Sequence, residues 1–409
     1  MSQAYRMLSV EDALDLVLAQ VHPLDAERVP ILDTLGRVLA EDVCADGDIP
    51  PLSNSAMDGY ALQAGDTLDA DPQNPARLRV IHDLRAGYTT DLEVTSGTAI
   101  RIMTGAPVPR GADTVIPFEE VERDGDWVTV PHPYPIGKNV RPAGEDVRRG
   151  QLVLKARTVV RPQEVGMLAA LGKREALTIR RPLVGILATG DELVAPESPL
   201  KPGKIRNANS YSNAAQVLKY GGVPMPLGIA RDDVGEVTER VREGLARGID
   251  LLLTSGGISA GDFDVVKEVL ATEGEMRFWQ VRMRPGKPLA FGRIGDVPLI
   301  GLPGNPVSAM VSFELFARPA ILKMLGREDL SKPTVQATLA EDVKTRAGFR
   351  HFLRVVLEEE DDGRYLARLT GGQGSGILLS MVRAHGLAII PEEEAGLRAG
   401  STVRVMLLD

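Results

Sequence analysis

The chain has 409 residues, a formal net charge of −9, a pI near 5.3 and one cysteine. This length predicts about three hydrophobic cores, and the acidic charge excludes a protein whose main task is to hold nucleic acid, while a local basic pocket for a small anion stays open. Because Cys44 has no disulfide partner and no apolar run approaches the roughly 20 residues that span a bilayer, we expect a soluble, cytoplasmic protein with no membrane partner.

The N-terminal segment is predicted to be helical. Apolar residues recur at helical spacing over 9–21, and Ser9 is a suitable N-cap with Asp12 three residues on. Acids within this first apolar stretch also exclude a signal peptide. A second short helix is expected over 32–40. Residues 46–62 are then dense in Pro, Asp, Ser and Gly, which indicates a domain boundary.

A small β domain is expected next, because residues 56–139 form short apolar segments between turns, with Asp124-Gly125 as a hairpin turn. Arg161-Pro162 then opens another helix that ends at Gly172. Helical segments therefore flank the β region on both sides. This order indicates that the β domain is inserted into a helical one.

Strands and helices alternate from Pro182 to about Gly326, which indicates a parallel, doubly wound sheet with helices on its faces. A long helix is expected over 307–325. Beyond Lys332 the pattern returns to strands, which predicts a C-terminal β barrel or sandwich. The predicted fold is multidomain α/β, with a discontinuous helical domain (1–52 and 140–178), an inserted β domain (53–139), a doubly wound domain (179–328) and a C-terminal β domain (329–409).

Three apolar strands run directly into glycine-rich turns: LVGILATGDEL, IDLLLTSGGISAGDFD and VPLIGLPGNPVSAM. In a doubly wound sheet such turns gather at the carboxyl ends of the strands, where ligands bind. Glycines let an anion approach backbone N–H groups, and the acids Asp191, Glu192, Asp262 and Asp264 are hard oxygen ligands of the kind Mg²⁺ prefers. The turns therefore predict a site for phosphate and metal.

Each of these features also has a purely structural interpretation. Asp191, Asp233, Asp262 or Asp264 are good helix N-caps, and Asn305-Pro306 is a good helix start. A pair of cations in RMRPGKPLAFG suits an oxyanion but also suits a solvated turn. The loop SNSAMDGYA, which contains Asp58, reads equally as a turn at a domain border.

Eight motifs occur in the order NSAMDGYA, RIMTGAPVP, AGEDV, ATGDEL, RDD, TSGGISAGDFD, RPGKPLAFG and GLPGNPVS. In this order they closely resemble the molybdopterin molybdenumtransferase family, which includes the E domain of gephyrin, over nearly the whole chain. The resemblance implies a homodimer of four-domain subunits. It also implies a transferase of molybdenum cofactor biosynthesis that consumes adenylylated molybdopterin and molybdate, needs Mg²⁺, inserts molybdenum at the dithiolene and releases AMP. A transient contact with the molybdopterin adenylyltransferase is also expected.

The matched motifs imply two groups of site residues. The catalytic group comprises Asp58, Thr104, Asp146, Glu192, Asp232 and Asp264, of which Glu192, Asp232 and Asp264 are the expected Mg²⁺ ligands. The cofactor-binding group comprises Gly190, Ser255, Gly256, Gly257, Gly304 and Asn305 on the glycine-rich turns, with Ser259, Arg284, Lys287, Pro288, Arg354 and Ser375 as an oxyanion pocket. Where many members have lysine, this chain has Gln280 and Arg284, which puts any role of position 280 in doubt.

Two other functions stay open at this point. The related molybdopterin adenylyltransferase shares the doubly wound domain, and its consumption of ATP would distinguish it. A non-catalytic binding scaffold of the same fold is the second alternative. The acids retained at positions 58, 192 and 264 count against a scaffold.

Overall fold

The computed structural model describes residues 7–257, 266, 268–270, 274–361 and 363–408. The chain forms two compact units. The first comprises Met1–Arg28, Gly36–Val38 and Leu177–Asp409, and the second comprises Val29–Leu35 and Leu39–Ala176. The division runs through a two-stranded sheet of β1 (Ala26–Pro30) and β12 (Glu175–Ile179). Within the described ranges, no helix combines the length and apolar character needed to cross a membrane.

The second unit contains a six-stranded sheet with the strand order β7-β4-β6-β5-β9-β8. Its strands confirm the predicted β region, and β8 and β9 form the hairpin expected at Asp124-Gly125. The same unit also contains two separate two-stranded sheets, β10-β3 and β11-β2. The strands are β2 (Val43–Cys44), β3 (Asn54–Ser55), β4 (Gly59–Leu62), β5 (Ala76–Leu84), β6 (Thr98–Ile102), β7 (Thr114–Pro117), β8 (Glu122–Asp124), β9 (Trp127–Val130), β10 (Val140–Arg141) and β11 (Leu152–Leu154).

One predicted helix of this unit is confirmed and one is wrong. Helix α2 (Pro162–Ala170) begins with proline at its first position and is followed by Gly172 in a left-handed conformation. The helix expected over 32–40 is only a 3-10 turn, η1 (Ile31–Thr34). Gly36 has a φ of 76°, so the backbone turns away two residues later and cannot continue a helix.

The first unit contains the doubly wound sheet, with the strand order β16-β13-β17-β21-β20-β18. The first four strands are parallel, and β20 and β18 extend the sheet as antiparallel strands. The prediction of a parallel sheet is confirmed, with this antiparallel edge as an addition. The strands are β13 (Leu183–Thr189), β16 (Val223–Ala230), β17 (Leu251–Ser255), β18 (Glu275–Gln280), β20 (Pro288–Ile294) and β21 (Val297–Leu302).

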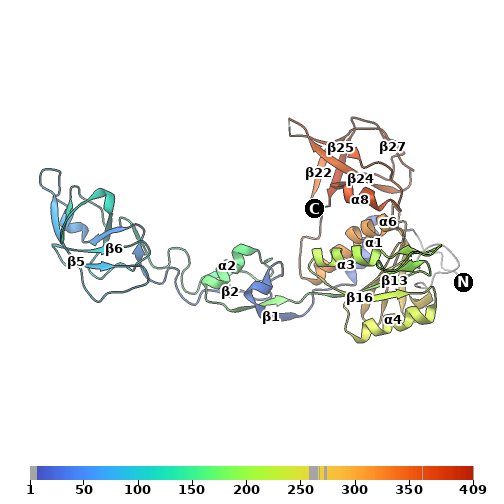
Figure 1. Ribbon diagram of the computed structural model, residues 1–409, viewed down its shortest axis with the longest axis horizontal. Helices are drawn as coiled ribbons and strands as arrows, with labels where there is room; N and C mark the ends of the chain where they lie inside the picture. The colour runs from blue at the N-terminus through green and yellow to red at the C-terminus, as the bar shows by residue number, and fades with distance from the viewer. Residues whose placement is uncertain (1–6, 258–265, 267, 271–273, 362, 409) are drawn as a thin grey trace. The chain divides into compact units, whose positions relative to one another are not determined.

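Helices cover both faces of this sheet. Successive side chains of a strand point to opposite sides, so the apolar strands present a core to each face. Val184 and Ile186 of β13 pack in a core with α1 (Val10–Ala19), α3 (Asn209–Lys219), α6 (Pro306–Ser312) and α7 (Arg318–Met324). Leu187 packs in the opposite core, with residues of α4 (Val234–Ala246). Figure 1 shows α4 on one side of β13 and β16 and α3 on the other. Helix α1 also confirms its predicted N-cap, since Ser9 Oγ accepts the Asp12 N–H at 3.0 Å.

The long helix predicted over 307–325 is three consecutive segments. These are α6 (Pro306–Ser312), a π-helical turn η4 (Phe313–Ala317) and α7 (Arg318–Met324). Pro319 lies within α7 and has no N–H to donate to the preceding turn, which accounts for the widened π turn before it.

The C-terminal strands close into a five-stranded barrel. The order β24-β25-β22-β28-β26 is closed by pairing of β24 with β26, so the predicted barrel or sandwich is a barrel. Strand β19 pairs in parallel with β24 and joins the doubly wound region to the barrel. The elements are β19 (Met283–Arg284), β22 (Thr334–Leu339), β23 (Val343–Lys344), β24 (Arg350–Glu359), β25 (Tyr365–Leu369), α8 (Leu378–Arg383), β26 (Gly386–Ile390), β27 (Gly396–Leu397) and β28 (Thr402–Leu407).

Candidate functional site

The carboxyl ends of the parallel strands β13, β16, β17 and β21 meet at one edge of the sheet. The turns that follow them interlock: the Gly190 N–H donates to Ala230 O at 3.2 Å, and the Gly256 N–H donates to Leu302 O at 3.2 Å. The sequence prediction that the three glycine-rich turns converge is therefore confirmed.

Glycine is required at position 256 for two reasons. Its φ is 92°, and a Cβ there would lie 2.3 Å from the Thr189 carbonyl oxygen. Gly304 lies next to it, since a Cβ at 304 would be 3.7 Å from the Gly256 Cα. The turns after β13, β17 and β21 thus touch through glycine backbone, which leaves space for a ligand at the edge.

A small cavity of about 120 Å³ opens at this edge, and we call it the glycine-edge cavity. Two buried hydroxyl groups line it: Thr189 and Ser255 are each 2% exposed, and neither hydroxyl has a hydrogen-bond partner among the described residues. Buried polar groups are normally satisfied, so these two point to a polar ligand. The lining residues are Thr189, Glu192, Leu193, Ile205, Arg206, Asn207, Ala208, Asn209, Ser255, Gly256, Gly304 and Pro306.

The acids at this edge have different local partners. The Asp191 and Asp232 carboxylates each face the other residue's backbone N–H at 3.4 Å. Asp233 caps α4, since its Oδ1 accepts the Glu236 N–H at 2.8 Å. The Glu192 carboxylate lies against Gly190, where a Cβ would be 2.6 Å from Oε2. Of these acids, Glu192 is the one that lines the glycine-edge cavity.

The described residues at this edge offer a metal ion few protein ligands. No group of three His, Cys, Asp or Glu side chains is assembled within the described ranges. Mg²⁺ commonly uses one or two carboxylates, completed by water and phosphate oxygens, and among the described residues Glu192 is the carboxylate that lines the cavity. The predicted residues Ser259, Asp262 and Asp264 lie outside the described residues, while Gly257 follows Gly256 in the same turn with a φ of 61°.

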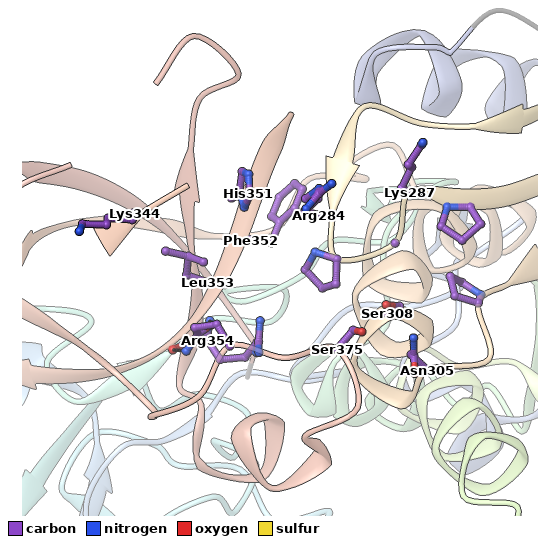
Figure 2. Close-up of a pocket in the computed structure, with 15 residues that line it drawn as sticks. Arg284, Lys287, Asn305, Ser308, Lys344, His351, Phe352, Leu353, Arg354 and Ser375 are labelled. Carbon is purple, nitrogen blue, oxygen red and sulfur yellow. Dashed lines mark hydrogen bonds between the residues drawn. The ribbon is translucent and has the colours of Figure 1, made fainter. Parts of the chain in front are cut away.

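A second and larger pocket, of about 420 Å³, lies between the 284–288 turn, the start of α6 and the C-terminal barrel. We call it the cationic pocket. Figure 2 shows Asn305, Ser308 and Ser375 together at one end, and Arg284 and His351 at another. The lining residues are Arg284, Pro285, Gly286, Lys287, Pro288, Pro303, Asn305, Ser308, Lys344, His351, Phe352, Leu353, Arg354, Gln373 and Ser375.

Four cations and no carboxylate are among these lining residues, all of which the structure describes. Arg354 is the most buried of the cations, at 1% exposure. Its guanidinium donates to Ser380 Oγ and Gly374 O, each at 3.1 Å, so both of its acceptors among the described residues are neutral. Burial lowers the pKa of Arg354 to about 10, so the group is still charged at neutral pH. A buried cation without a counter-ion predicts an anionic ligand.

Arg284 is positioned by the pairing of two strands and by stacking on an aromatic ring. Arg284 of β19 pairs with His351 of β24, and its guanidinium lies over the Phe349 ring at 4.8 Å. Arginine stacks on an aromatic face better than lysine, which suits it to this position. Burial lowers the pKa of His351, a backbone contact with Arg346 opposes this shift, and the Arg284 charge adds to it.

Residues 303–308 form the wall between the two cavities, and we call them the 303–308 turn. Pro303, Asn305 and Ser308 line the cationic pocket, while Gly304 and Pro306 line the glycine-edge cavity. The predicted helix start is confirmed, because Asn305 is the backbone N-cap of α6, but its side chain makes no capping hydrogen bond. The barrel reaches the same turn, since the Val307 N–H donates to Ser375 O at 3.1 Å.

Three predicted residues belong to the second unit. The backbone N–H and the hydroxyl of Thr104 both donate to Asp58 Oδ1, at 2.7 and 2.8 Å. These two hydrogen bonds lower the pKa of Asp58. Asp146 is exposed on a turn, where its N–H donates to Ile49 O at 3.0 Å. The structure thus brings Asp58 and Thr104 together as a pair.

Sequence reasoning missed several residues of both cavities. Lys344 is on β23, which pairs with β27, and His351 is on the barrel strand β24; a single basic residue on a strand carries no local signal of a site. Asn209, whose amide donates to Gly304 O at 2.8 Å, is in α3 and looked like an ordinary helix residue. Gln280, the position left in doubt, is not among the residues that line the cationic pocket.

Fold and site define a class of multidomain α/β protein in which a doubly wound region and a C-terminal barrel together line a cationic pocket. The chain is 38% identical to molybdopterin molybdenumtransferase 2 of Mycobacterium tuberculosis (strain H37Rv), over 98% of this chain and 99% of that protein. It is 36% identical to the molybdopterin molybdenumtransferase of Bacillus subtilis (strain 168), over 94% and 90%. The chain belongs to the molybdopterin molybdenumtransferase family.

Family models and solved structures agree with this membership. The chain matches the MoeA N-terminal region (domain I and II) over residues 8–172, the probable molybdopterin binding domain over 185–323, and the MoeA C-terminal region (domain IV) over 336–408. The crystal structure of a molybdopterin biosynthesis MoeA protein from Pyrococcus horikosii matches with a TM-score of 0.85 and 32% identity, over 99% of this chain and 100% of that one.

Proposed function

We propose that this chain transfers molybdenum from molybdate to adenylylated molybdopterin and releases AMP, in a Mg²⁺-dependent step of molybdenum cofactor biosynthesis. One observation carries the proposal. Two cavities of different chemistry share the 303–308 turn: one is lined by glycines, a carboxylate and Arg206, and the other by four cations without a carboxylate among its described lining residues. Such a pair suits a reaction that joins a nucleotide phosphate with an oxyanion.

The cationic pocket supports the oxyanion half of the proposal. Molybdate is a tetrahedral dianion, and Arg354 offers it a buried charge with no competing carboxylate among the described residues. Charge-assisted hydrogen bonds of this kind are roughly twice as strong as neutral ones. Ser308 and Ser375 add hydroxyl donors at the end of the pocket nearest the 303–308 turn. We assign molybdate to this end.

The glycine-edge cavity supports the phosphate half. Glycines at positions 256 and 304 keep side chains out of this edge, and the open hydroxyls of Thr189 and Ser255 are donors for a phosphate. We propose that Glu192, Asp232 and Asp264 hold Mg²⁺, which when bound would polarise the phosphate bond whose cleavage frees AMP. Glu192 lines this cavity and not the cationic pocket, so its carboxylate would not compete with molybdate for the cations.

The proposal includes a homodimer, a cytoplasmic location and a transient contact with the adenylyltransferase that supplies the substrate. Asp58, Thr104 and Asp146 are proposed as functional polar residues on the family motifs they match. The Asp58–Thr104 pair supports this in one respect, since two hydrogen bonds keep the carboxylate ionised and fixed. Sedimentation equilibrium of the full chain tests the dimer directly.

The deciding assay supplies the full chain with adenylylated molybdopterin and Mg²⁺, with and without molybdate, and measures AMP. We expect AMP release that depends on molybdate. A parallel reaction with molybdopterin and ATP should consume no ATP, which separates this function from the adenylyltransferase. Absence of molybdate-dependent AMP release would contradict the proposal. An Asp264→Asn variant that kept every measurable function of a chain without such release would favour the scaffold alternative.

A further inference from the structure

Part of the barrel side of the cationic pocket comes from a short loop, residues 371–376, which we call the GGQGSG loop. Gln373 and Ser375 of this loop line the pocket. Four of the six residues are glycines, and Gly371 has a φ of 101°. Glycine loses more conformational freedom on folding than any other residue, so a loop of this composition needs specific contacts to keep one shape.

The side-chain amide of Gln373 bonds the backbone of Arg354 as a neighbouring strand would. The pairing of β24 with β25 ends at Val355 and Leu369, so Arg354 lies one position beyond it. The Arg354 N–H donates to Gln373 Oε1 at 2.9 Å, and Gln373 Nε2 donates to Arg354 O at 3.1 Å. The same carbonyl accepts the Thr370 N–H at 3.1 Å. One side chain thus satisfies both backbone groups of Arg354 on this side.

The GGQGSG loop also contacts the side chain of Arg354. The Arg354 Nη2 donates to Gly374 O at 3.1 Å, one residue after Gln373. The loop then reaches the 303–308 turn, where the Val307 N–H donates to Ser375 O at 3.1 Å. Figure 2 shows Ser375 beside this turn. The loop therefore connects the buried cation to the wall between the two cavities.

Gln373 lines the pocket, but its amide has no hydrogen left for an anion. The atom that faces the Arg354 N–H must be an acceptor, which fixes the orientation of the amide with Oε1 at that position. The two hydrogens of Nε2 are then directed to Arg354 O and Gly371 O, each at 3.1 Å. A neutral amide with both hydrogens used does not donate to an oxyanion. The contacts of Gln373 are with the backbone that carries Arg354.

We propose that Gln373 is a positioning residue of the oxyanion site, an inference that rests on the proposed function. Gln373 fixes the backbone of Arg354 and the course of the GGQGSG loop, so the guanidinium has one direction of approach to an anion before the anion binds. Such preorganisation raises affinity, because little ordering is required on binding. Gln373 acts through Arg354 and not by contact with molybdate.

Gln373→Met is the first test, because methionine has a similar length and loses all three hydrogen bonds of the amide. We expect molybdate affinity, measured by calorimetry on the full chain, to fall about tenfold. The molybdate concentration that half-saturates AMP release should rise by the same factor at an unchanged maximal rate. A residue with only a structural role would reduce the folded fraction and leave the affinity of the folded protein unchanged.

A double-mutant cycle with Arg354→Met separates action through Arg354 from direct contact with the anion. In the Arg354→Met background, Gln373→Met should lower molybdate affinity by no more than about twofold, because the group that it positions is gone. A loss of about tenfold in both backgrounds would overturn the inference. Gln373→Asn is the second variant: its amide is one methylene shorter and cannot bond both backbone groups, so it should show the same loss and the same dependence on Arg354.

Gln336→Met is the matched control, because it makes the same substitution at an exposed position of the barrel strand β22. It should leave molybdate affinity and AMP release unchanged. Wild-type molybdate affinity in folded Gln373→Met or Gln373→Asn would overturn the inference. If the wild-type chain binds molybdate but shows no molybdate-dependent AMP release, the proposed function is wrong and the calorimetric cycle still decides the role of Gln373. If the wild-type chain binds no molybdate, both are wrong.

Discussion

The glycine-edge cavity and the cationic pocket share the 303–308 turn but are lined by different kinds of groups. The first lies where turns of the doubly wound sheet meet through glycine, and Gly256 allows the turns after β13 and β17 to touch. The second is made of charged side chains from two regions, with Arg284 on β19 and Arg354 on β24. Ligand binding in the glycine-edge cavity should therefore depend on backbone conformation, whereas binding in the cationic pocket should depend on charge. Substitutions in the two cavities should therefore damage different properties of the protein.

Arg354→Met should have the largest effect on ligand binding. We expect molybdate affinity to fall about 100-fold, close to 2.7 kcal/mol, because a buried charge-assisted contact is lost. Stability should be unchanged or increased, since a buried guanidinium without a carboxylate partner carries a desolvation cost. Calorimetry with molybdate and urea denaturation measure the two quantities.

Arg350→Met is the control, four residues earlier on the same strand. Arg350 pairs with Glu11 and with Glu392, the latter at 3.0 Å. Its loss should reduce the free energy of unfolding by about 1–2 kcal/mol and leave molybdate affinity unchanged. A reversed pattern, in which Arg354→Met only destabilises and Arg350→Met only weakens molybdate binding, would contradict the assignment of the pocket.

Among substitutions in the glycine-edge cavity, Glu192→Gln should slow AMP release the most. The amide keeps the size of the side chain but is a poor magnesium ligand, so we expect Mg²⁺-dependent AMP release to slow about 100-fold. Molybdate affinity should not change, because Glu192 lines the other cavity. Glu197→Gln, which alters an exposed acid of the same loop, should have no effect on either quantity. A fall in molybdate affinity in Glu192→Gln would show that the two cavities are not separate.

Gly256→Ala tests the backbone character of the edge. We expect a loss of about 3 kcal/mol in the free energy of unfolding, from the positive φ and from the close approach to the Thr189 carbonyl. Gly203 has a positive φ of 78° with open space around its Cα, so Gly203→Ala should cost only about 1 kcal/mol. Denaturant titrations of both variants compare them. Equal costs would mean that the turns do not need to touch.

His351 should make molybdate affinity depend on pH, and this effect should be smaller than those above. Its pKa lies below the ordinary value, chiefly because of burial, so the ring is neutral at pH 7 and gains a proton as the pH falls. Molybdate affinity should rise about threefold between pH 7 and 5.5, and this rise should be absent in His351→Gln.

The ligand-free protein should respond with the opposite sign. A base whose folded pKa is lowered binds fewer protons folded than unfolded, so stability falls as the pH drops through the unfolded value of about 6.5. Parallel titrations of affinity and stability in wild type and His351→Gln test both signs. An identical pH dependence in the two proteins would show that protonation of His351 does not affect molybdate binding.

The backbone site was largely predictable from sequence, and the side-chain pocket was predictable only through the family resemblance. Apolar strands ending in glycine, as at Thr189-Gly190 and Ser255-Gly256, have a local pattern that fixes where the turns lie. Lys344 and His351 have no such pattern, because their position in the pocket depends on how the barrel closes and on the pairing of β19 with β24. Tertiary pairing of this kind is not encoded in any short segment.

The 303–308 turn shows the same limit. Asn305 and Pro306 were recognisable as a helix start, and the structure has them there. Their second role, as a wall with residues facing two different cavities, follows only from the contact of the barrel at Ser375 with Val307. The helix expected over 32–40 failed for a simpler reason, since the left-handed Gly36 outweighed the apolar pattern around it.

The central claim is that two distinct cavities serve one reaction, and the rate of AMP release as a function of molybdate concentration tests it most directly. The wild-type chain should show saturation by molybdate. Arg354→Met should reach the same maximal rate at about 100-fold higher molybdate, while Glu192→Gln should lower the maximal rate at an unchanged half-saturation point. AMP release that is independent of molybdate in the wild-type chain would contradict the claim.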